Sequence, residues 1–175
     1  MDSVRNMKQD GGKEKIIERI QIGPFDIDTW CISPFPKGYE IRSKMWICQF
    51  CLKYMRSEKK CKLHCLRSCD MRNPPGKMIY SQGIISIFQV DGKQFKFYCQ
   101  CLSFLGKLFI LDKTICYHVE PFMFYVLCEV ENKDAHIVGY FSKEKNSLEG
   151  YNLSCLMILP PHQRKGTGIK KQRFG

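Results

Sequence analysis

The stretch Tyr151–Gly168, YNLSCLMILPPHQRKGTG, is the part of the sequence that decides the fold. Within it, Leu153–Leu159 is a continuous apolar run apart from one Ser and one Cys. A run of this length is typical of a β-strand that is buried on both faces. Pro160 and Pro161 then end the strand, because a proline has no N–H to donate to a β-ladder.

The turn that follows the two prolines, Gln163–Gly168, is basic and rich in glycine, and it is of the kind that opens a helix. Glycines let backbone N–H groups approach a ligand closely, and N–H groups at a helix N-terminus carry partial positive charge. Arg164 and Lys165 add charge to this turn. The turn therefore suits a pyrophosphate, with the thiol of Cys155 just upstream; the alternative is an ordinary surface turn.

Length and composition limit the class of protein. The chain has 175 residues, of which 44% are hydrophobic, which is enough for one modest core with a small satellite domain at most. No apolar run approaches the ~18 residues that a membrane span requires, and residues 1–15 lack the apolar segment of a secretory signal. We therefore expect a cytosolic or nuclear protein with no membrane partner.

The cysteine count and the charge point to ligands. Eleven cysteines in a reducing compartment indicate metal ligation or buried thiols rather than disulfides. The net charge of +11 favours an anionic partner, either nucleic acid or a phosphate-bearing cofactor. A basic surface that is merely solvated is the alternative.

A second motif lies in residues 45–75 and follows the pattern C-x2-C-x12-H-x4-C. A β-hairpin turn would present the thiolates of Cys48 and Cys51, and a following helix would present His64 and Cys69 about one turn apart. Four such ligands complete the tetrahedron that zinc prefers. The spacing therefore predicts a zinc finger of the C2HC type.

Two further cysteines leave the ligand set open. Cys61 precedes His64 by three residues and can share its helix face, whereas Cys65 adjoins His64 and points off that face. Cys61 is therefore the better substitute ligand of the two, and both are otherwise spare thiols.

The remaining chain predicts antiparallel hairpins around one buried helix. Ile84–Val90 is expected to form a strand that turns at Asp91–Gly92 into a returning strand, Gln94–Gln100. Leu102–Leu111 has helical length and is apolar except for a stripe that holds Ser103 and Lys107. Other expected strands lie within residues 20–29, 122–128, 136–142 and 153–159, and His118, His136 and His162 are expected to be structural.

Several blocks of this sequence resemble the MYST family of lysine (histone) acetyltransferases, in the order of that family. The most specific are VEPFMFYVL, HIVGYFSKEK and CLMILPPHQRKGTG. The others are IDTW with SPFP, CQFCLKYM with CDMRNPPG, ISIFQVDGK and FYCQCLSFLGKLF. The resemblance runs from about Ile20 to Gly168, and it looks closest to the branch that acetylates nucleosomal histone tails as part of large complexes.

This resemblance implies an α/β (mixed α+β) fold, with a GNAT-like acetyltransferase core and an N-terminal C2HC zinc finger. It implies acetyl transfer from acetyl-coenzyme A to a lysine ε-amine, with Zn²⁺ in the finger. In such enzymes the strand that matches Leu156, Met157 and Ile158 lies along the pantetheine arm. The turn that matches Gln163, Arg164, Lys165, Gly166, Thr167 and Gly168 wraps the pyrophosphate.

The resemblance also assigns two single residues. Cys155 matches the active-site cysteine of the family, which is either a covalent acetyl carrier or a bystander near the thioester. Lys107 matches the lysine that becomes autoacetylated.

The chain departs from the family pattern in several places. A lysine, with a pKa of ~10.4, must lose a proton before it attacks a thioester, and in the family a glutamate downstream of the glycine turn removes that proton. No such glutamate follows here, and residues 169–175 are a short basic tail where the family has an apolar helix, so we expect this chain to be catalytically incomplete. One extra residue between His64 and Cys69 puts Cys69 in doubt as a ligand.

The expected organisation follows from these patterns. A disordered N-terminus (residues 1–15) precedes a segment with the zinc finger (16–76), the first part of an acetyl-CoA-binding core (77–168) and the divergent tail (169–175). The resemblance implies a nuclear protein whose partners are nucleosomal histone tails, nucleosomal DNA and subunits of chromatin-modifying complexes. The alternatives are a non-catalytic zinc-finger module that binds nucleosomal DNA or a complex partner, and a non-functional product with an exposed apolar sheet edge.

Overall fold

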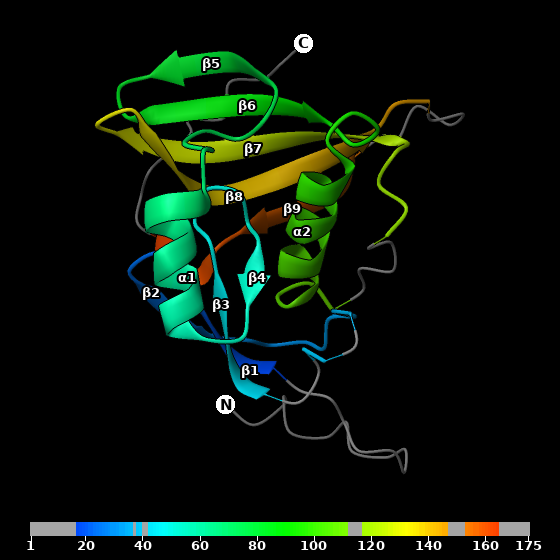
Figure 1. Ribbon diagram of the computed structural model, residues 1–175. Helices are drawn as coiled ribbons and strands as arrows, with labels where there is room; N and C mark the ends of the chain where they lie inside the picture. Colours follow the sequence, from blue (N-terminus) through cyan, green and yellow to red (C-terminus); the bar gives the residue numbers. More distant parts are fainter. Residues whose placement is uncertain (1–16, 37, 40–41, 112–116, 147–152, 165–175) are drawn as a thin grey trace.

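The computed structural model describes residues 17–36, 38–39, 42–111, 117–146 and 153–164, which form two β-sheets and short helices in a mixed α+β fold (Figure 1). The strands are β1 (Ile17–Ile22), β2 (Phe25–Asp28), β3 (Arg42–Ile47), β4 (Tyr54–Met55), β5 (Lys77–Gln82), β6 (Ile85–Asp91), β7 (Phe122–Glu131), β8 (Asp134–Glu144) and β9 (Leu153–Ile158). The helical elements are α1 (Glu58–Leu63), the π-helical turn η1 (His64–Ser68), α2 (Lys96–Lys107) and the 3-10 turn η2 (Pro160–His162). No helix in these ranges is long and apolar enough to cross a membrane.

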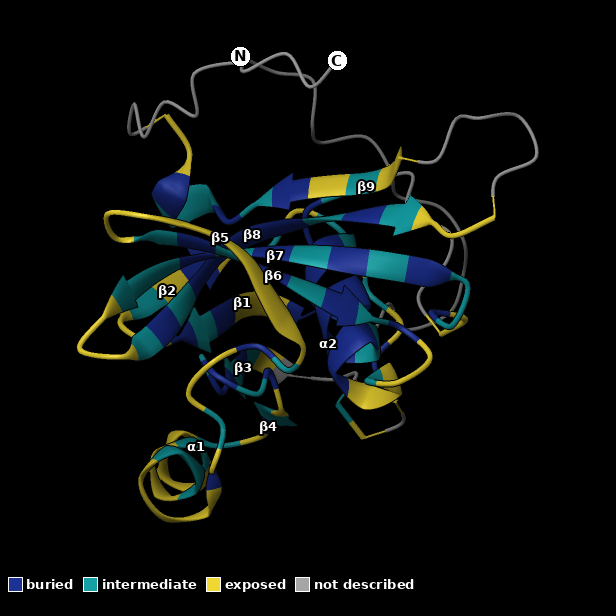
Figure 2. Ribbon diagram, turned by 90° about the horizontal axis from the view of Figure 1, so that it is seen from above, coloured by how far each residue is buried: buried dark blue, intermediate teal, exposed yellow. Residues whose placement is uncertain are grey.

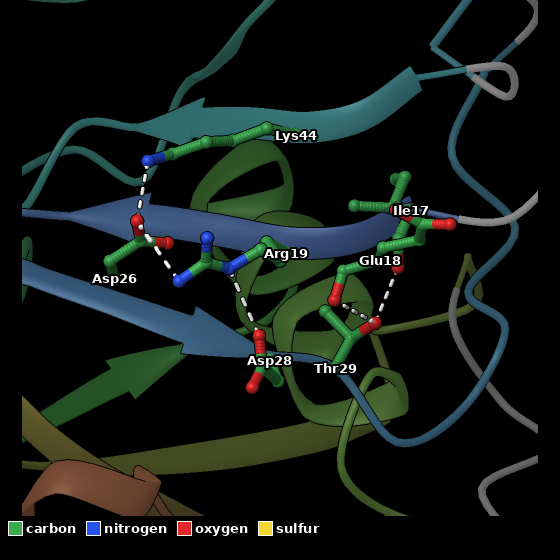
Figure 3. Close-up of polar contacts among 7 residues, drawn as sticks. All are labelled: Ile17, Glu18, Arg19, Asp26, Asp28, Thr29 and Lys44. Carbon is green, nitrogen blue, oxygen red and sulfur yellow. Dashed lines mark hydrogen bonds and ion pairs between the residues drawn. The ribbon is translucent and has the colours of Figure 1, made fainter.

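The smaller sheet has the strand order β2-β1-β3-β4, with β1 antiparallel to β2 and parallel to β3. Opposite charges face one another across its three longer strands (Figure 3): Arg19 contacts Asp26 at 3.3 Å and Asp28 at 3.0 Å, and Lys44 contacts Asp26 at 2.7 Å. Exposed pairs of this kind contribute about 1 kcal/mol at most. Their main effect is therefore on register, because they match opposite charges on adjacent strands.

The larger sheet is an antiparallel array in the order β5-β6-β7-β8-β9. Alternate residues on its central strands are buried, including Phe88, Val90, Phe124, Val126 and Tyr140, so one face of the sheet is apolar. Helix α2 and the smaller sheet contribute to the same core (Figure 1). Their core residues include Leu102, Leu105, Ile20 and Ile47.

Helix α2 packs very close to the larger sheet. A Cβ at Gly106 would lie only 2.1 Å from the Tyr140 hydroxyl oxygen, so only glycine allows this approach. The C-terminal turn of α2 is held by the chain before β3: the Trp30 and Cys31 N–H groups donate to the Leu108 carbonyl at 2.9 and 3.0 Å. These bonds satisfy a carbonyl that has no partner within the helix.

The predicted returning strand, Gln94–Gln100, is wrong, because residues 96–107 form α2. The buried residues Tyr98, Cys101, Leu102 and Leu105 repeat at the spacing of a helix face, and this spacing begins before the predicted helix start. Ser103, on the polar stripe of the predicted helix, is also buried.

The two edge strands of the larger sheet also differ from expectation. Strand β9 is not buried on both faces: it lies at the edge of the sheet, and Leu153 and Leu156 are 61% and 65% exposed (Figure 2). The other edge strand, β5, was not predicted, and every residue in it is exposed. A strand with no buried face gives no alternating pattern, and β5 forms because Gly83, at φ +58°, turns the chain back onto β6.

The other expected strands of the larger sheet are confirmed. Strand β7 covers residues 122–131 and strand β8 covers residues 134–144, both longer than predicted. A tight turn joins them, with Asn132 and Lys133 at positive φ. The predicted disordered N-terminus and the basic tail lie outside the described residues.

Asp91 joins β6 to α2, and its removal tests this junction. Its carboxylate accepts hydrogen bonds from the Lys93 and Gln94 N–H groups and from the Lys145 ammonium. We expect Asp91→Ala to lower the free energy of unfolding by about 1 kcal/mol at neutral pH, as loss of a helix cap does. The hydrogen bond from Lys145 lowers the pKa of Asp91, so its contribution is present above the ordinary aspartate pKa of ~3.9 and is lost as the pH falls through the folded-state value.

Urea unfolding of both proteins at neutral pH and at about pH 3 measures this effect. Asp28→Ala is the matched control, because the Asp28 carboxylate is 81% exposed and pairs with Arg19 at the surface. It should change the free energy by less than about 0.5 kcal/mol. A loss from Asp91→Ala that is equal at both pH values contradicts the assignment.

Candidate functional site

The first half of the zinc finger (residues 45–75) is a tight turn between β3 and β4. The Cys48 N–H donates to the Lys53 carbonyl at 2.9 Å, and the Leu52 N–H donates to the Cys48 carbonyl at 3.0 Å. Leu52 has φ +62°, which reverses the chain within this short turn. The turn thus holds the thiols of Cys48 and Cys51 on one side of the hairpin, as the sequence predicted.

The second half of the finger is α1 followed by the π-helical turn η1. The Ser57 hydroxyl caps α1 by accepting from the Lys60 N–H at 3.4 Å. At the end of η1 the Cys69 N–H donates to the His64 carbonyl, five residues earlier, at 2.8 Å. This wider turn absorbs the extra residue between His64 and Cys69, because a π turn takes one residue more than an α turn.

The four predicted ligands meet in space. The ligand atoms of Cys48, Cys51, His64 and Cys69 all lie within 4.8 Å of one another. The Cys48 and Cys69 sulfurs are 3.7 Å apart, and the Cys51 sulfur is 3.2 Å from His64 Nε2. Zn–S bonds of ~2.3 Å in a tetrahedron place two sulfurs about 3.8 Å apart. The cluster therefore fits zinc in both donor type and spacing.

The local environment favours the thiolate that zinc binds. A hydrogen bond from Cys51 lowers the pKa of Cys48 to about 4, although burial opposes this shift. The same hydrogen bond raises the pKa of Cys51, which is the donor. Zinc would displace the thiol protons of its cysteine ligands when it binds, because the thiolate is the form that coordinates the metal.

The finger is fixed to the larger sheet through β8. The Phe50 ring lies 5.8 Å from the His136 ring, and a His136 ring nitrogen contacts the Gln49 side-chain oxygen at 3.3 Å. Arg72 donates to the Cys69 carbonyl at 2.9 Å and lies over the Phe50 ring. These contacts give His136 the structural role that was expected for it.

Of the two extra cysteines, Cys65 lies closer to a predicted ligand than expected. Its sulfur is 3.6 Å from that of Cys48. Cys61 is half-buried in the finger cluster, and burial raises its pKa. The prediction from sequence made Cys61, not Cys65, the better substitute ligand. It differed from the structure because a regular helix through His64 was assumed.

Strand β9 carries the second predicted site. In its register with β8, Cys155 is opposite Ser142 and Met157 is opposite Tyr140. Opposite residues share a face of the sheet, and Tyr140 faces Gly106 of α2, so Cys155 also lies on the α2 face. The Cys155 side chain is half-buried against the core.

The backbone of β9 has an open side. The Leu159 N–H donates to the Val138 carbonyl of β8 at 2.9 Å. Because backbone groups alternate along a strand, those of Met157 also face β8, and those of Leu156 and Ile158 face the open edge. The Gln163 side-chain amide donates to the Ile158 carbonyl at 2.6 Å, which agrees with this orientation.

The other predicted site residues lie near the ends of these elements or outside the described chain. Arg164 is exposed and has φ +61°, and residues 165–168 are not described. Lys107 ends α2 and donates to the Leu111 carbonyl at 2.6 Å.

His118 is exposed, whereas His162 is buried, 3.7 Å from a Glu129 carboxylate oxygen. A shallow hollow lined by β5 and β6 lies at the edge of the sheet opposite β9, so it is separate from these residues.

Comparison with known proteins matches residues 73–170 to the MOZ/SAS family and residues 14–69 to the MYST family zinc finger domain. The chain belongs to the MOZ/SAS family. The mixed fold, the GNAT-like core expected for this family and the zinc finger are consistent with that membership.

Named relatives share about half of their aligned residues with this chain. The histone acetyltransferase MOF of Drosophila melanogaster is 50% identical over 156 residues, which are 89% of this chain and 19% of the relative. A putative MYST-like histone acetyltransferase 1 of Oryza sativa subsp. japonica is 49% identical over 89% of this chain and 34% of its own length. Human histone acetyltransferase KAT6A is 48% identical over 85% of this chain and 7% of its own length. The chain thus spans about a third or less of these curated relatives.

Replacing one cysteine of the cluster tests the zinc site. We expect the wild-type chain to bind one zinc ion and Cys51→Ser to lose it, because a serine hydroxyl is a poor zinc ligand and three ligands leave the site open. Metal analysis of the purified proteins after dialysis measures the zinc content. Cys31→Ser is the matched control, because Cys31 is a half-buried thiol that is not part of the cluster. Equal zinc in Cys51→Ser and Cys31→Ser would show that the site lies elsewhere.

Proposed function

We propose that this chain is part of a histone acetyltransferase that transfers the acetyl group of acetyl-CoA to histone lysine ε-amines. Membership of the MOZ/SAS family supports the reaction class, and the printed names of the relatives support histone as the substrate. The observation that carries the proposal is the open edge of β9, where an apolar strand has backbone groups that face away from the sheet.

The open edge suits the pantetheine arm of acetyl-CoA. This arm is a narrow chain with two amide groups, and an extended amide chain pairs with a sheet edge as an added strand does. Leu156 and Ile158 would supply the backbone groups, and the exposed Leu156 side chain would cover the arm. Met157, which is 4% exposed, holds the strand from the core side. Gln163, Arg164 and residues 165–168 would hold the pyrophosphate beyond the end of the strand.

The reacting end of the cofactor would lie near Cys155. We favour direct attack of a deprotonated substrate lysine on the thioester, with backbone N–H groups stabilising the oxyanion. Cys155 would then be a neighbour of the thioester rather than an acetyl carrier. Lys107 is the proposed autoacetylation site, and acetylation would remove the charge that strengthens its hydrogen bond to the Leu111 carbonyl.

The proposed partners follow from the same function. Nucleosomal histone tails would be substrates, and nucleosomal DNA and subunits of chromatin-modifying complexes would be binding partners in the nucleus. The net charge of +11 favours contact with DNA phosphates. The organisation into a zinc-finger segment (16–76) and the first part of an acetyl-CoA-binding core (77–168) is proposed on the same basis.

A proline at position 156 tests cofactor binding at the open edge. Leu156→Pro removes one N–H from the open side of β9, while the ladder to β8 keeps its bonds. We expect it to weaken acetyl-CoA binding by at least about tenfold, which corresponds to the loss of one hydrogen bond of ~1.4 kcal/mol. Calorimetric titration with acetyl-CoA measures the affinity.

Leu156→Ala is the matched control for this experiment. It removes side-chain contact but keeps the N–H, so it should weaken binding less than the proline does. Thermal unfolding of both variants checks that the sheet is intact. Equal affinities for Leu156→Pro and Leu156→Ala would place the cofactor away from this edge.

The role of Cys155 is tested by its chemistry. If Cys155 is a bystander, the wild-type chain incubated with acetyl-CoA should carry no acetyl thioester, and Cys155→Ala should keep its affinity for acetyl-CoA. Intact-mass analysis before and after hydroxylamine treatment detects a thioester. A hydroxylamine-sensitive acetyl group that is absent from Cys155→Ala would establish the carrier role instead.

A further inference from the structure

The zinc finger contains two overlapping sets of ligand spacings. The first, C-x2-C-x12-H-x4-C, ends in His64 and Cys69, and the second, C-x2-C-x13-C-x3-C, ends in Cys65 and Cys69. In a regular α-helix, residues four apart share a face and residues five apart do not. The second spacing is therefore the one that an α-helix would present to a metal.

The structure adopts the first spacing by distorting the helix. The hydrogen bond from the Cys69 N–H to the His64 carbonyl makes residues 64–68 a π turn. Such turns are rare and short, and they commonly occur at functional sites. The chain thus departs from regular helix geometry at the point where doing so brings His64 to the cluster.

Cys65 already lies at ligand distance from one sulfur of the site. The Cys65 and Cys48 sulfurs are 3.6 Å apart, compared with 3.7 Å for Cys48 and Cys69. Both values are close to the ~3.8 Å expected for two sulfurs on one tetrahedral zinc. Cys65 is outside the group of four whose ligand atoms lie within 4.8 Å of one another, so it borders the site on the Cys48 side.

Burial and charge allow a fourth thiolate here. Cys65 is half-buried and packs with the finger cluster, so its side chain points inward rather than to solvent. Replacing a neutral imidazole by a thiolate adds one negative charge. Two basic residues on the helical elements of the finger, Lys60 on α1 and Arg67 on η1, would offset part of this charge.

We propose that Cys65 is a reserve zinc ligand that replaces His64 when residues 64–68 change from the π to the α register. The finger then has two ligand states, C2HC through His64 and C4 through Cys65. In the exchange the Zn–N bond to His64 breaks, the Cys65 thiol releases its proton to solvent, and a Zn–S bond forms. The exchange replaces the His64 imidazole by a thiolate at one corner of the tetrahedron, so it does not compensate for loss of Cys51.

Zinc content of four full-length variants tests the exchange. His64→Ala should keep most of its zinc through competition with a chelator, and His64→Ala/Cys65→Ser should lose it. Cys65→Ser alone should behave as wild type. His64→Ala/Cys61→Ser is the matched control, because it removes a half-buried thiol of the same cluster, and it should retain zinc as His64→Ala does.

Cobalt and alkylation give independent readouts of the ligand set. Substitution with Co²⁺ should show stronger sulfur charge-transfer absorption in His64→Ala than in wild type, because four sulfurs replace three. In zinc-loaded wild type, N-ethylmaleimide should modify Cys65 before Cys48, Cys51 and Cys69. In zinc-loaded His64→Ala, Cys65 should be protected as well.

Two outcomes overturn the proposal. The first is that His64→Ala loses as much zinc as His64→Ala/Cys65→Ser. This outcome counts whether the finger unfolds or Cys65 does not bind zinc, because a reserve ligand must hold the finger without His64. The second is retention of zinc by His64→Ala/Cys65→Ser together with its loss from the Cys61 double variant, which would assign the reserve role to Cys61.

Discussion

The close approach of α2 to the larger sheet is the constraint on which the rest of this structure depends. Gly106 has no Cβ, and a Cβ at this position would lie 2.1 Å from the Tyr140 hydroxyl oxygen. With the helix at this distance, one face of β6, β7 and β8 becomes the core. The end of the helix then offers the Leu108 carbonyl to Trp30 and Cys31, which connects the smaller sheet to the same core. The close packing at Gly106 and the bonds at Leu108 thus join α2 to both sheets.

A second constraint acts in the finger, where ligand geometry prevails over helix geometry. Metal binding of a structural zinc site contributes on the order of 10 kcal/mol to folding, whereas distorting one helical turn costs far less. The chain can therefore absorb an extra residue between His64 and Cys69 as a π turn and keep four donors within 4.8 Å. The extra residue put Cys69 in doubt because it departs from the spacing of the family that the sequence resembles, and the π turn places Cys69 in the cluster in spite of it.

These cases show what the sequence could and could not predict. Cysteine and histidine spacing indicated the finger because metal ligation is a local pattern with few alternatives. Strands β7 and β8 were predictable because their apolar residues pack on one face. The start of α2 was missed because Phe97 and Tyr98 also suit a strand, and only the packing of Tyr98 with Leu102 and Leu105 decides for a helix. Strand β5 gave no signal, since no residue in it is buried.

Strand β9 shows how the same residues support two different interpretations. An apolar run predicts burial on both faces in an isolated sequence, yet here the strand lies at an edge with Leu153 and Leu156 exposed. Alternation along the strand then separates two chemical roles: the Cys155 side chain faces α2, and the Leu156 backbone faces the open edge. A slip of one residue in the register with β8 would exchange these positions. Gly139 of β8 lies close to the Met157 carbonyl, where a Cβ would approach to 2.3 Å, so this close approach of β8 and β9 needs glycine at position 139. The pairing of β9 with β8 therefore determines which atoms of the candidate site face a ligand.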